Sequence, residues 1–260
     1  MLSVTKERLE IMESNKYFVD RGASRYKIKS FEAYFPDQPV VQALIQAALK
    51  GDLETAKKMV AAGGDPNALG AIEPGSAFGF SPLHYALGAN SPTAIRILAA
   101  VGADPEREAS EMGMPLLFAV MLNNADLLSL LLDLKPIQKL TPKTQAHLLF
   151  ESARRDAPRC LVLLLERGVP LDAMDTAHYT LFLRSFEMNL PDLALWLLQR
   201  GAAIDIASAS GATAIDLLQR NLDKTARNSP NYPILLEVQR LMKERGAVFP
   251  KSTELNRHPL

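Results

Sequence analysis

Cysteine and histidine are scarce in this sequence, and their scarcity removes several kinds of site. Cys160 is the single cysteine in 260 residues, which excludes an internal disulfide framework and a cysteine-rich zinc site. The 4 histidines are scattered without the spacing of metal ligands: His84, His147, His178 and His258. The sequence therefore predicts no metal ion and no cofactor.

An excess charge of one sign and a long apolar run are also missing. The 29 lysines and arginines balance the 29 aspartates and glutamates, so no net field favours nucleic acid as a partner. No stretch approaches the roughly 18 apolar residues of a membrane span. Charges interrupt residues 1–35 throughout, so no export signal is predicted there. We expect a cytoplasmic protein as the chain stands, and a periplasmic one if an export signal has been removed.

A repeat organises the remaining sequence, which is rich in leucine and alanine. The motif Ser81-Pro82-Leu83-His84-Tyr85-Ala86 is close to T-P-L-H-x-A, and equivalent positions recur at 81, 114, 147, 180 and 213, a constant spacing of 33 residues. An earlier unit begins at Gln42. Motif and period resemble the ankyrin-repeat family. The resemblance implies an all-α solenoid of about six helix-turn-helix units with capping segments.

Turn residues recur within this period where two helices must be joined. The tenth position of successive units holds residues that enter the left-handed region cheaply: Gly51, Asn90, Asn123, Asp156 and Asn189. Prolines suited to the first turn of a second helix follow at 92, 158 and 191. Glycines that can end this second helix stand at 63, 102, 168 and 201. Each unit is thus predicted to be a helical hairpin.

Several segments depart from the period. Lys135-Pro136 replaces a glycine, so we expect an irregular finger over 137–142. In the last unit we predict a loop over 223–233 and a capping helix over 235–245. The aromatic-rich residues 1–36, with a short helix over 5–15, are interpreted as a cap, with a partner-docking arm or disorder as alternatives. Residues 37–250 are assigned to the repeats and 251–260 to a tail.

Catalytic chemistry is not indicated anywhere in the sequence. His84 belongs to the repeat motif, where an imidazole bonds neighbouring turns, and Cys160 occupies an apolar helical position that favours a buried thiol over a nucleophile. Gly63-Gly64 ends a helix instead of opening one, so it is not a phosphate loop. We therefore do not expect an enzyme.

What remains is an exposed face for a protein partner. Stacked hairpins of this kind present the first helices and the connecting fingers as a concave surface, which we call the wall. The fifth and eighth positions of the units should face it, and those proposed to contact a partner are Tyr85, Phe118, Met121, Glu151, Arg154 and Arg184. The alternative is that Phe118 and Met121 pack between repeats.

The first finger, residues 70–80, is six residues longer than the repeat requires. It carries Ile72, Phe78 and Phe80 among glycines. Apolar side chains on such a loop would normally be exposed to solvent. Either they fold back onto the flanking helix, or they form a tip that reaches into a cleft of the partner.

A narrower resemblance suggests a function. Glu32-Ala33-Tyr34-Phe35-Pro36-Asp37 near the start and Glu244-Arg245-Gly246-Ala247-Val248-Phe249-Pro250 near the end are similar to bacterial ankyrin proteins encoded beside type VI secretion effectors, notably phospholipases. This resemblance implies an immunity protein that binds and neutralises a cognate toxin. The alternative is an adaptor or scaffold for a host or cellular regulatory protein. The neighbouring gene would discriminate between them.

Overall fold

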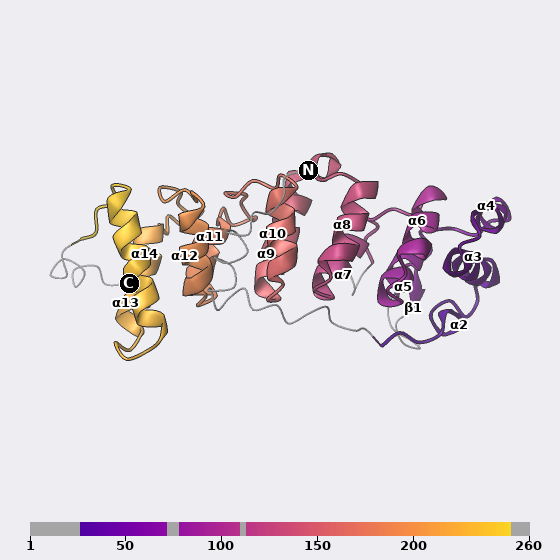
Figure 1. The fold of residues 1–260 in the computed structure, drawn as a ribbon, viewed down its shortest axis with the longest axis horizontal. Coiled ribbons are helices and arrows are strands. Elements are labelled where there is room, and N and C mark those ends of the chain that lie inside the picture. The colour runs from indigo at the N-terminus through magenta and orange to yellow at the C-terminus, as the bar shows by residue number, and fades with distance from the viewer. Residues whose placement is uncertain (1–26, 72–77, 110–112, 251–260) are drawn as a thin grey trace. The chain divides into compact units, whose positions relative to one another are not determined.

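The computed structural model describes residues 27–71, 78–109 and 113–250 (Figure 1). The chain divides into two compact units with a boundary at Gly168/Val169. We call residues 27–168 the amino-terminal stack and residues 169–250 the carboxy-terminal stack. The predicted helix over 5–15, the tail over 251–260 and Ile72 lie outside the described residues.

Both stacks are built from helical hairpins, as the 33-residue period predicts. The amino-terminal stack contains α2 (Phe31–Tyr34) and the pairs α3 (Pro39–Lys50) and α4 (Leu53–Ala61), α5 (Pro82–Gly88) and α6 (Pro92–Ala100), α7 (Pro115–Met121) and α8 (Ala125–Leu134), α9 (Pro142–Arg154) and α10 (Pro158–Glu166). The carboxy-terminal stack contains α11 (Leu181–Glu187) and α12 (Pro191–Gln199), α13 (Ala214–Lys224) and α14 (Asn231–Glu244). First helices pack on first helices and second helices on second helices within each stack, so an apolar face left wet by one hairpin is buried by the next.

The turn inside each hairpin confirms the prediction made from the tenth position. The five residues there all have positive φ angles: Gly51 at 81°, Asn90 at 50°, Asn123 at 48°, Asp156 at 54° and Asn189 at 55°. This conformation reverses the chain within two residues, and the prolines of α6, α10 and α12 then start the second helix. A few residues per repeat therefore determine the geometry of the hairpin.

The first finger forms a short β-hairpin. Strand β1 (Gly70–Ala71) pairs antiparallel with β2 (Phe78–Phe80), with Gly70 opposite Phe80 and Ala71 opposite Phe78. Later fingers keep single antiparallel bridges: Ala109 with Gly113, Met174 with Thr180, and Ala207 with Thr213. A Cβ on Gly70 would lie 2.3 Å from the carbonyl oxygen of Tyr34, so only glycine lets the finger approach α2 this closely.

The fourth unit replaces its finger with extra helix. A 3-10 turn, η2 (Ile137–Lys139), fills the segment predicted to be irregular, and α9 then begins at Pro142. The period places this start near His147, which is wrong by about five residues. The cause is a stronger start signal upstream, because the Thr141 hydroxyl accepts from the Thr144 amide and Pro142 suits the first turn.

The last hairpin also differs from its prediction. Helix α13 continues to Lys224 and α14 begins at Asn231, so the connection is shorter than the predicted loop over 223–233. Pro233 does not delay α14, because a proline in the first turn removes an amide that has no intrahelical acceptor. The helix ends at Glu244, and Gly246, whose φ is 92°, follows its C-cap residue.

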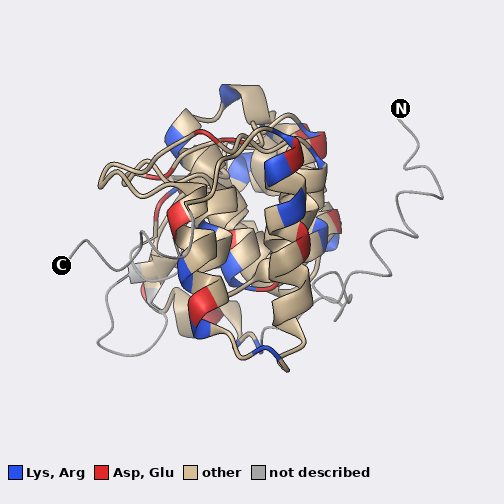
Figure 2. Cartoon of the chain, turned by 90° about the vertical axis from the view of Figure 1, so that its left-hand side faces the viewer, with Lys and Arg blue, Asp and Glu red and all other residues tan. Residues whose placement is uncertain are grey.

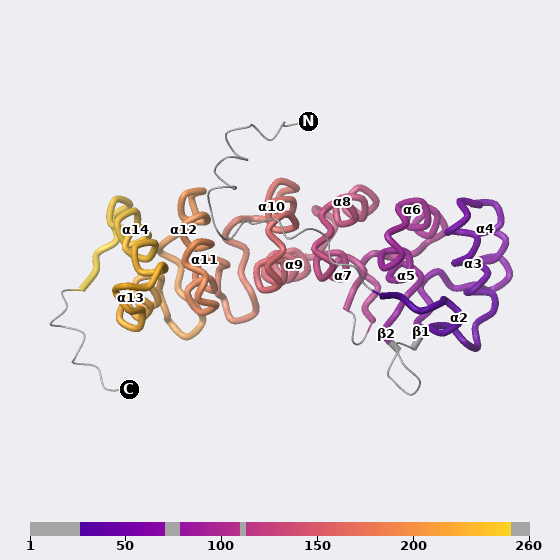
Figure 3. Tube along the Cα trace, turned by 60° about the horizontal axis from the view of Figure 1, so that its bottom comes forward, coloured from indigo at the N-terminus to yellow at the C-terminus, as the bar shows by residue number. Residues whose placement is uncertain are grey.

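A row of rings forms the core of the amino-terminal stack. The rings of Tyr34 and Phe80 stack with centroids 4.3 Å apart, and Phe80 meets the edge of Phe118 at 6.0 Å. His84 lies beside both phenylalanines, at 5.6 and 5.4 Å. All four side chains are at most 1% exposed. The rings come from α2, β2, α5 and α7, whose backbone traces lie near one another in Figure 3.

The carboxy-terminal stack uses fewer aromatic residues. Trp196 on α12 is 1% exposed, and Phe182 and Phe186 on α11 meet edge to face at 5.1 Å. Leucines of α12 and α13 and Met242 of α14 fill the remaining space. Both cores bury many aliphatic side chains, and the amino-terminal one adds the row of rings.

Candidate partner-binding surface

The structure separates the predicted wall residues into buried and exposed sets. Phe118 is 1% exposed and Tyr85 is 7%, so the predicted exposure of these two side chains is wrong, and Phe80, for which both alternatives were open, is 0% exposed. Phe80 and Phe118 belong to the row of rings, as the packing alternative stated. In the folded protein neither can contact a partner.

Tyr85 does occupy the wall, but the aromatic segment before the repeats covers it. The rings of Phe31 and Tyr34 approach it edge to face, at 5.9 and 6.1 Å. Burial, followed by the charge of Glu32, raises the pKa of Tyr85 above its usual value. The wall at α5 is therefore already occupied by residues of the same chain.

The structure shows for one apolar residue of the first finger whether it folds back or is exposed. Phe80 folds back onto the stack, which agrees with the first alternative for that side chain. The backbone of Phe78 pairs with that of Ala71. Met121, at the end of α7, remains half-buried at the edge of the wall.

Helix α9 presents the first exposed charged group. Glu151 accepts from Arg154 Nε at 2.7 Å and Nη2 at 2.6 Å, and from Arg155 Nε at 3.0 Å. Burial alone would raise the pKa of the Glu151 carboxyl, but the hydrogen bonds from the two arginines outweigh it and lower this pKa. One carboxylate thus orients two guanidinium groups, and we name Glu151, Arg154 and Arg155 the α9 triad.

Helix α11 presents a second charged group, in which carboxylates outnumber guanidinium groups. Arg184 Nη2 lies 2.6 Å from Asp175 Oδ2, and Nη1 also bonds Glu187. The guanidinium stands 3.9 Å from the ring centroid of Tyr179. We name Asp175, Arg184 and Glu187 the α11 triad.

Sequence reasoning singled out Arg184 but missed Asp175 and Tyr179. Both lie in the finger that precedes α11, where the Asp175 carboxylate also accepts from the Ala177 and Tyr179 amides at 2.9 and 3.0 Å. An acidic residue followed by a turn ahead of a capping threonine was the available signal. The partners of a wall arginine therefore come from the finger as well as from the helix.

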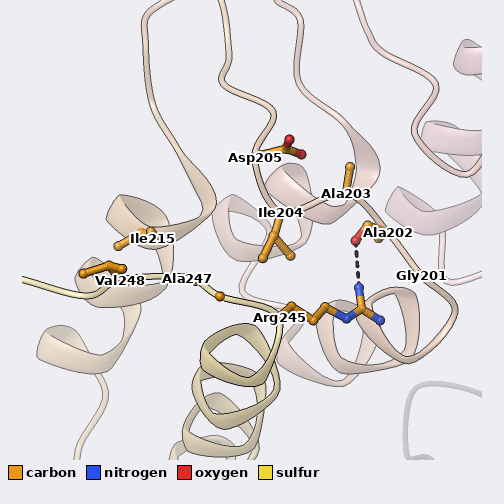
Figure 4. A pocket seen from close by; sticks show the side chains of 10 residues that line it. Gly201, Ala202, Ala203, Ile204, Asp205, Ile215, Arg245, Ala247 and Val248 are labelled. Carbon is orange, nitrogen blue, oxygen red and sulfur yellow. Dashed lines mark hydrogen bonds between the residues drawn. The ribbon is translucent and has the colours of Figure 1, made fainter.

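Two surface hollows lie in the carboxy-terminal stack. One, of about 570 Å³, is lined by Ile204, Ile215 and Val248 beside Arg245, which donates to the carbonyl oxygen of Ala202 at 3.1 Å (Figure 4). The other, of about 540 Å³, is lined partly by Arg220 and Lys224.

The remaining reactive side chains are structural. Ser81 Oγ lies 2.8 Å from Nδ1 of His84, and burial lowers the pKa of this histidine to about 3, so the ring is neutral at pH 7. Cys160 is fully buried as predicted, and burial raises its pKa to about 12. Over the described ranges, no group of three or more potential metal ligands is present.

Charge is spread over both stacks without a single dominant sign (Figure 2). None of the helices among the described residues is sufficiently long and apolar to cross a membrane. In each stack, the exposed first helix carries oriented polar and charged side chains, the α9 triad in one and the α11 triad in the other. Side chains of this kind can recognise a protein.

Comparison with known proteins agrees with this description. Residues 44–144 match the family model for ankyrin repeats, described as three copies. The chain is 30% identical over 132 residues to the E3 ubiquitin-protein ligase KEG of Arabidopsis thaliana, and the match covers 48% of this chain and 8% of that protein. The chain thus spans a small part of that relative.

Solved structures show the same fold. The ankyrin-repeat domain of Bcl-3, described as a unique member of the IkappaB protein family, gives a TM-score of 0.55 at 20% identity over 76% of this chain and 97% of that one. An ankyrin-repeat domain from Acinetobacter baumannii AYE gives 0.52 at 20% identity over 75% and 97%. Residues 44–144 thus match ankyrin repeats, and the described residues have the fold of an ankyrin-repeat solenoid. This fold is generally a non-catalytic scaffold for protein interactions.

Proposed function

We propose that this protein is a non-catalytic binding module that neutralises a cognate bacterial toxin, as an immunity protein for a secreted, phospholipase-type effector. Binding takes place at the wall, where the α9 and α11 triads are exposed. We propose the cytoplasm as the site of action for the chain as it stands, and the periplasm if an export signal has been removed.

The observation that supports this proposal best is the orientation of the wall arginines. Arg184 is held between Asp175 and Glu187 and over Tyr179, so little side-chain freedom remains to be lost on binding. Arginine and tyrosine are residue types that anchor protein interfaces. A surface prepared in this way favours tight, specific association with a protein over loose adsorption.

A second function, that of an adaptor for a cellular regulatory protein, is compatible with the same wall. The match to part of an E3 ubiquitin-protein ligase favours it. The two functions differ in what the partner does when it is free. An immunity protein restores growth to cells that produce its partner, and an adaptor does not.

The test is co-expression with the product of the neighbouring gene. Immunity requires that the wild-type chain restores growth and co-purifies with that product. Replacement of Arg184 by alanine is expected to weaken binding by more than about 2 kcal/mol, roughly thirtyfold. The matched control is Arg240→Ala, because Arg240 on α14 also binds two carboxylates, those of Glu237 and Glu244. Failure of the wild-type chain to restore growth would show that it is not an immunity protein for this product.

A further inference from the structure

The exposed face of α9 carries cations in addition to those of the α9 triad. Lys143, His147, Phe150 and Arg154 fall within about 60° of one another around the helix axis. Lys143, His147 and Arg154 are exposed, and Phe150 is half-buried among them. Lys139, in η2 just before the helix, is exposed as well. We call these five residues the α9 face.

The two lysines of this face are not neutralised within the described part of the chain. Lys139 and Lys143 form no ion pair there, and the single carboxylate of Glu151 is shared by Arg154 and Arg155. By contrast, Lys135 pairs with both Asp104 and Glu106. An excess of positive charge therefore remains along α9.

The missing finger is what exposes this face. The first helices α5, α7 and α11 each begin just after a finger that forms an antiparallel bridge. In the fourth unit the 3-10 turn and the additional helical residues occupy that place, and Lys143 lies on the added part. The fourth unit thus presents a helical face where its neighbours present a loop.

We infer that the α9 face is a docking site for an acidic segment of a protein partner. Lys143 and Arg154 lie about 16 Å apart along the helix axis. The segment would carry carboxylates at a similar separation, with an apolar side chain between them to contact Phe150. Charge complementarity of this kind fixes the register of a partner and speeds its association. The inference rests on the proposed function as a binding module and specifies the chemistry of the partner.

The experiment uses a labelled 15-residue helical peptide with glutamates near both ends and leucine at the centre. Its binding to the full chain is measured by fluorescence anisotropy at about 0.05 and 0.2 M salt, since screening should weaken the complex. The site variant is Lys139→Glu/Lys143→Glu. The control is Lys50→Glu/Lys58→Glu, which changes net charge equally at two exposed positions of the first hairpin.

We expect the site variant to bind the peptide at least tenfold more weakly and the control within twofold of wild type. Equal losses in both variants, or no binding by wild type, would overturn the inference. So would tighter binding of a single-stranded oligonucleotide that the site variant abolishes. Stronger peptide binding by Glu10→Gln/Glu13→Gln in the full chain would show instead that the residues before Lys27 occupy the face.

This result can be separated from the test of immunity. If the peptide binds as expected while co-expression fails, the α9 face stands and the toxin proposal falls. If the site variant restores growth as well as wild type does and also binds the peptide normally, immunity stands and the α9 face falls.

Discussion

The two triads occupy the same repeat positions and are opposite in charge. In α9 the fifth position is Glu151 and the eighth is Arg154, whereas in α11 the fifth is Arg184 and the eighth is Glu187. The α9 triad has one carboxylate and two guanidinium groups, and the α11 triad has one guanidinium and two carboxylates. In both helices the two positions are three residues apart and lie on the same face. The repeat therefore fixes where a side chain points, and the choice of residue fixes what it can recognise.

The triads can be compared only while both stacks are folded. The largest expected effect is therefore on the stability of a stack. Phe118→Ala in the amino-terminal stack should lower the free energy of unfolding by about 3–5 kcal/mol, because it leaves a cavity beside Phe80 and His84. Urea denaturation measures this value. Met121→Ala on the same helix is the control and should cost much less, since Met121 is half-buried. Similar values for both would contradict the packing described for Phe118.

Acid should weaken the amino-terminal stack through His84. The folded pKa of this histidine is about 3 and its unfolded value is about 6.5, so the unfolded chain binds more protons between these values. Stability is thus complete above pH 6.5 and falls as the pH decreases. Between pH 7.5 and 5 the loss is about 2 kcal/mol. Denaturation of wild type and His84→Gln at both values tests this, because the variant should lose most of the dependence. If His84→Gln keeps the same pH dependence of the free energy of unfolding, that dependence comes from other groups.

The turns should be equally sensitive in the two stacks. Asn90→Ala and Asn189→Ala should each cost about 1 kcal/mol, because alanine enters the left-handed region less easily than asparagine. Glycine at the same positions should be close to neutral. Thermal or urea unfolding of the four variants measures the difference. A glycine variant as unstable as the alanine variant would point to a role of the asparagine side chain.

The smallest expected effect distinguishes the triads themselves. Glu151→Gln and Arg184→Met should each lower the free energy of unfolding by less than about 1 kcal/mol, because both groups are partly exposed and screened by solvent. The losses should shrink at high salt. In partner binding the two variants should differ, since Glu151→Gln leaves two arginines in place and Arg184→Met leaves two carboxylates. Large, salt-independent losses would mean that the triads stabilise the fold.

Sequence periodicity predicted most of the fold because each hairpin is specified locally. A left-handed residue recurs in five of the hairpins, with a proline and a glycine in several of them, and the structure confirms their roles. The period could not predict the start of α9, because the local signal at Thr141 and Pro142 overrides it. Lys135, which replaces a glycine, binds Asp104 and Glu106 of an earlier finger, and spacing alone does not reveal such a contact.

The candidate site was predicted less well, and the reason is burial. Phe118 and Arg184 share a repeat position, yet one is covered and the other is exposed. Exposure depends on which side chains pack over a position. For Phe118 these include the ring of Phe80, which comes from the first finger. A pattern within one repeat does not contain this information.

The stacking of Tyr34 on Phe80 has a consequence for the order of folding. Most contacts in a repeat protein join residues close in sequence, but this one closes a loop that contains α3, α4 and the first finger. The entropy of closing that loop is lost before the ring contact can form, so α2 docks late. The same segment is the first to detach when the protein opens locally, and its amide protons should exchange with solvent sooner than those of α5. Tyr85 would become accessible at that moment, while the hairpins beneath it remain folded.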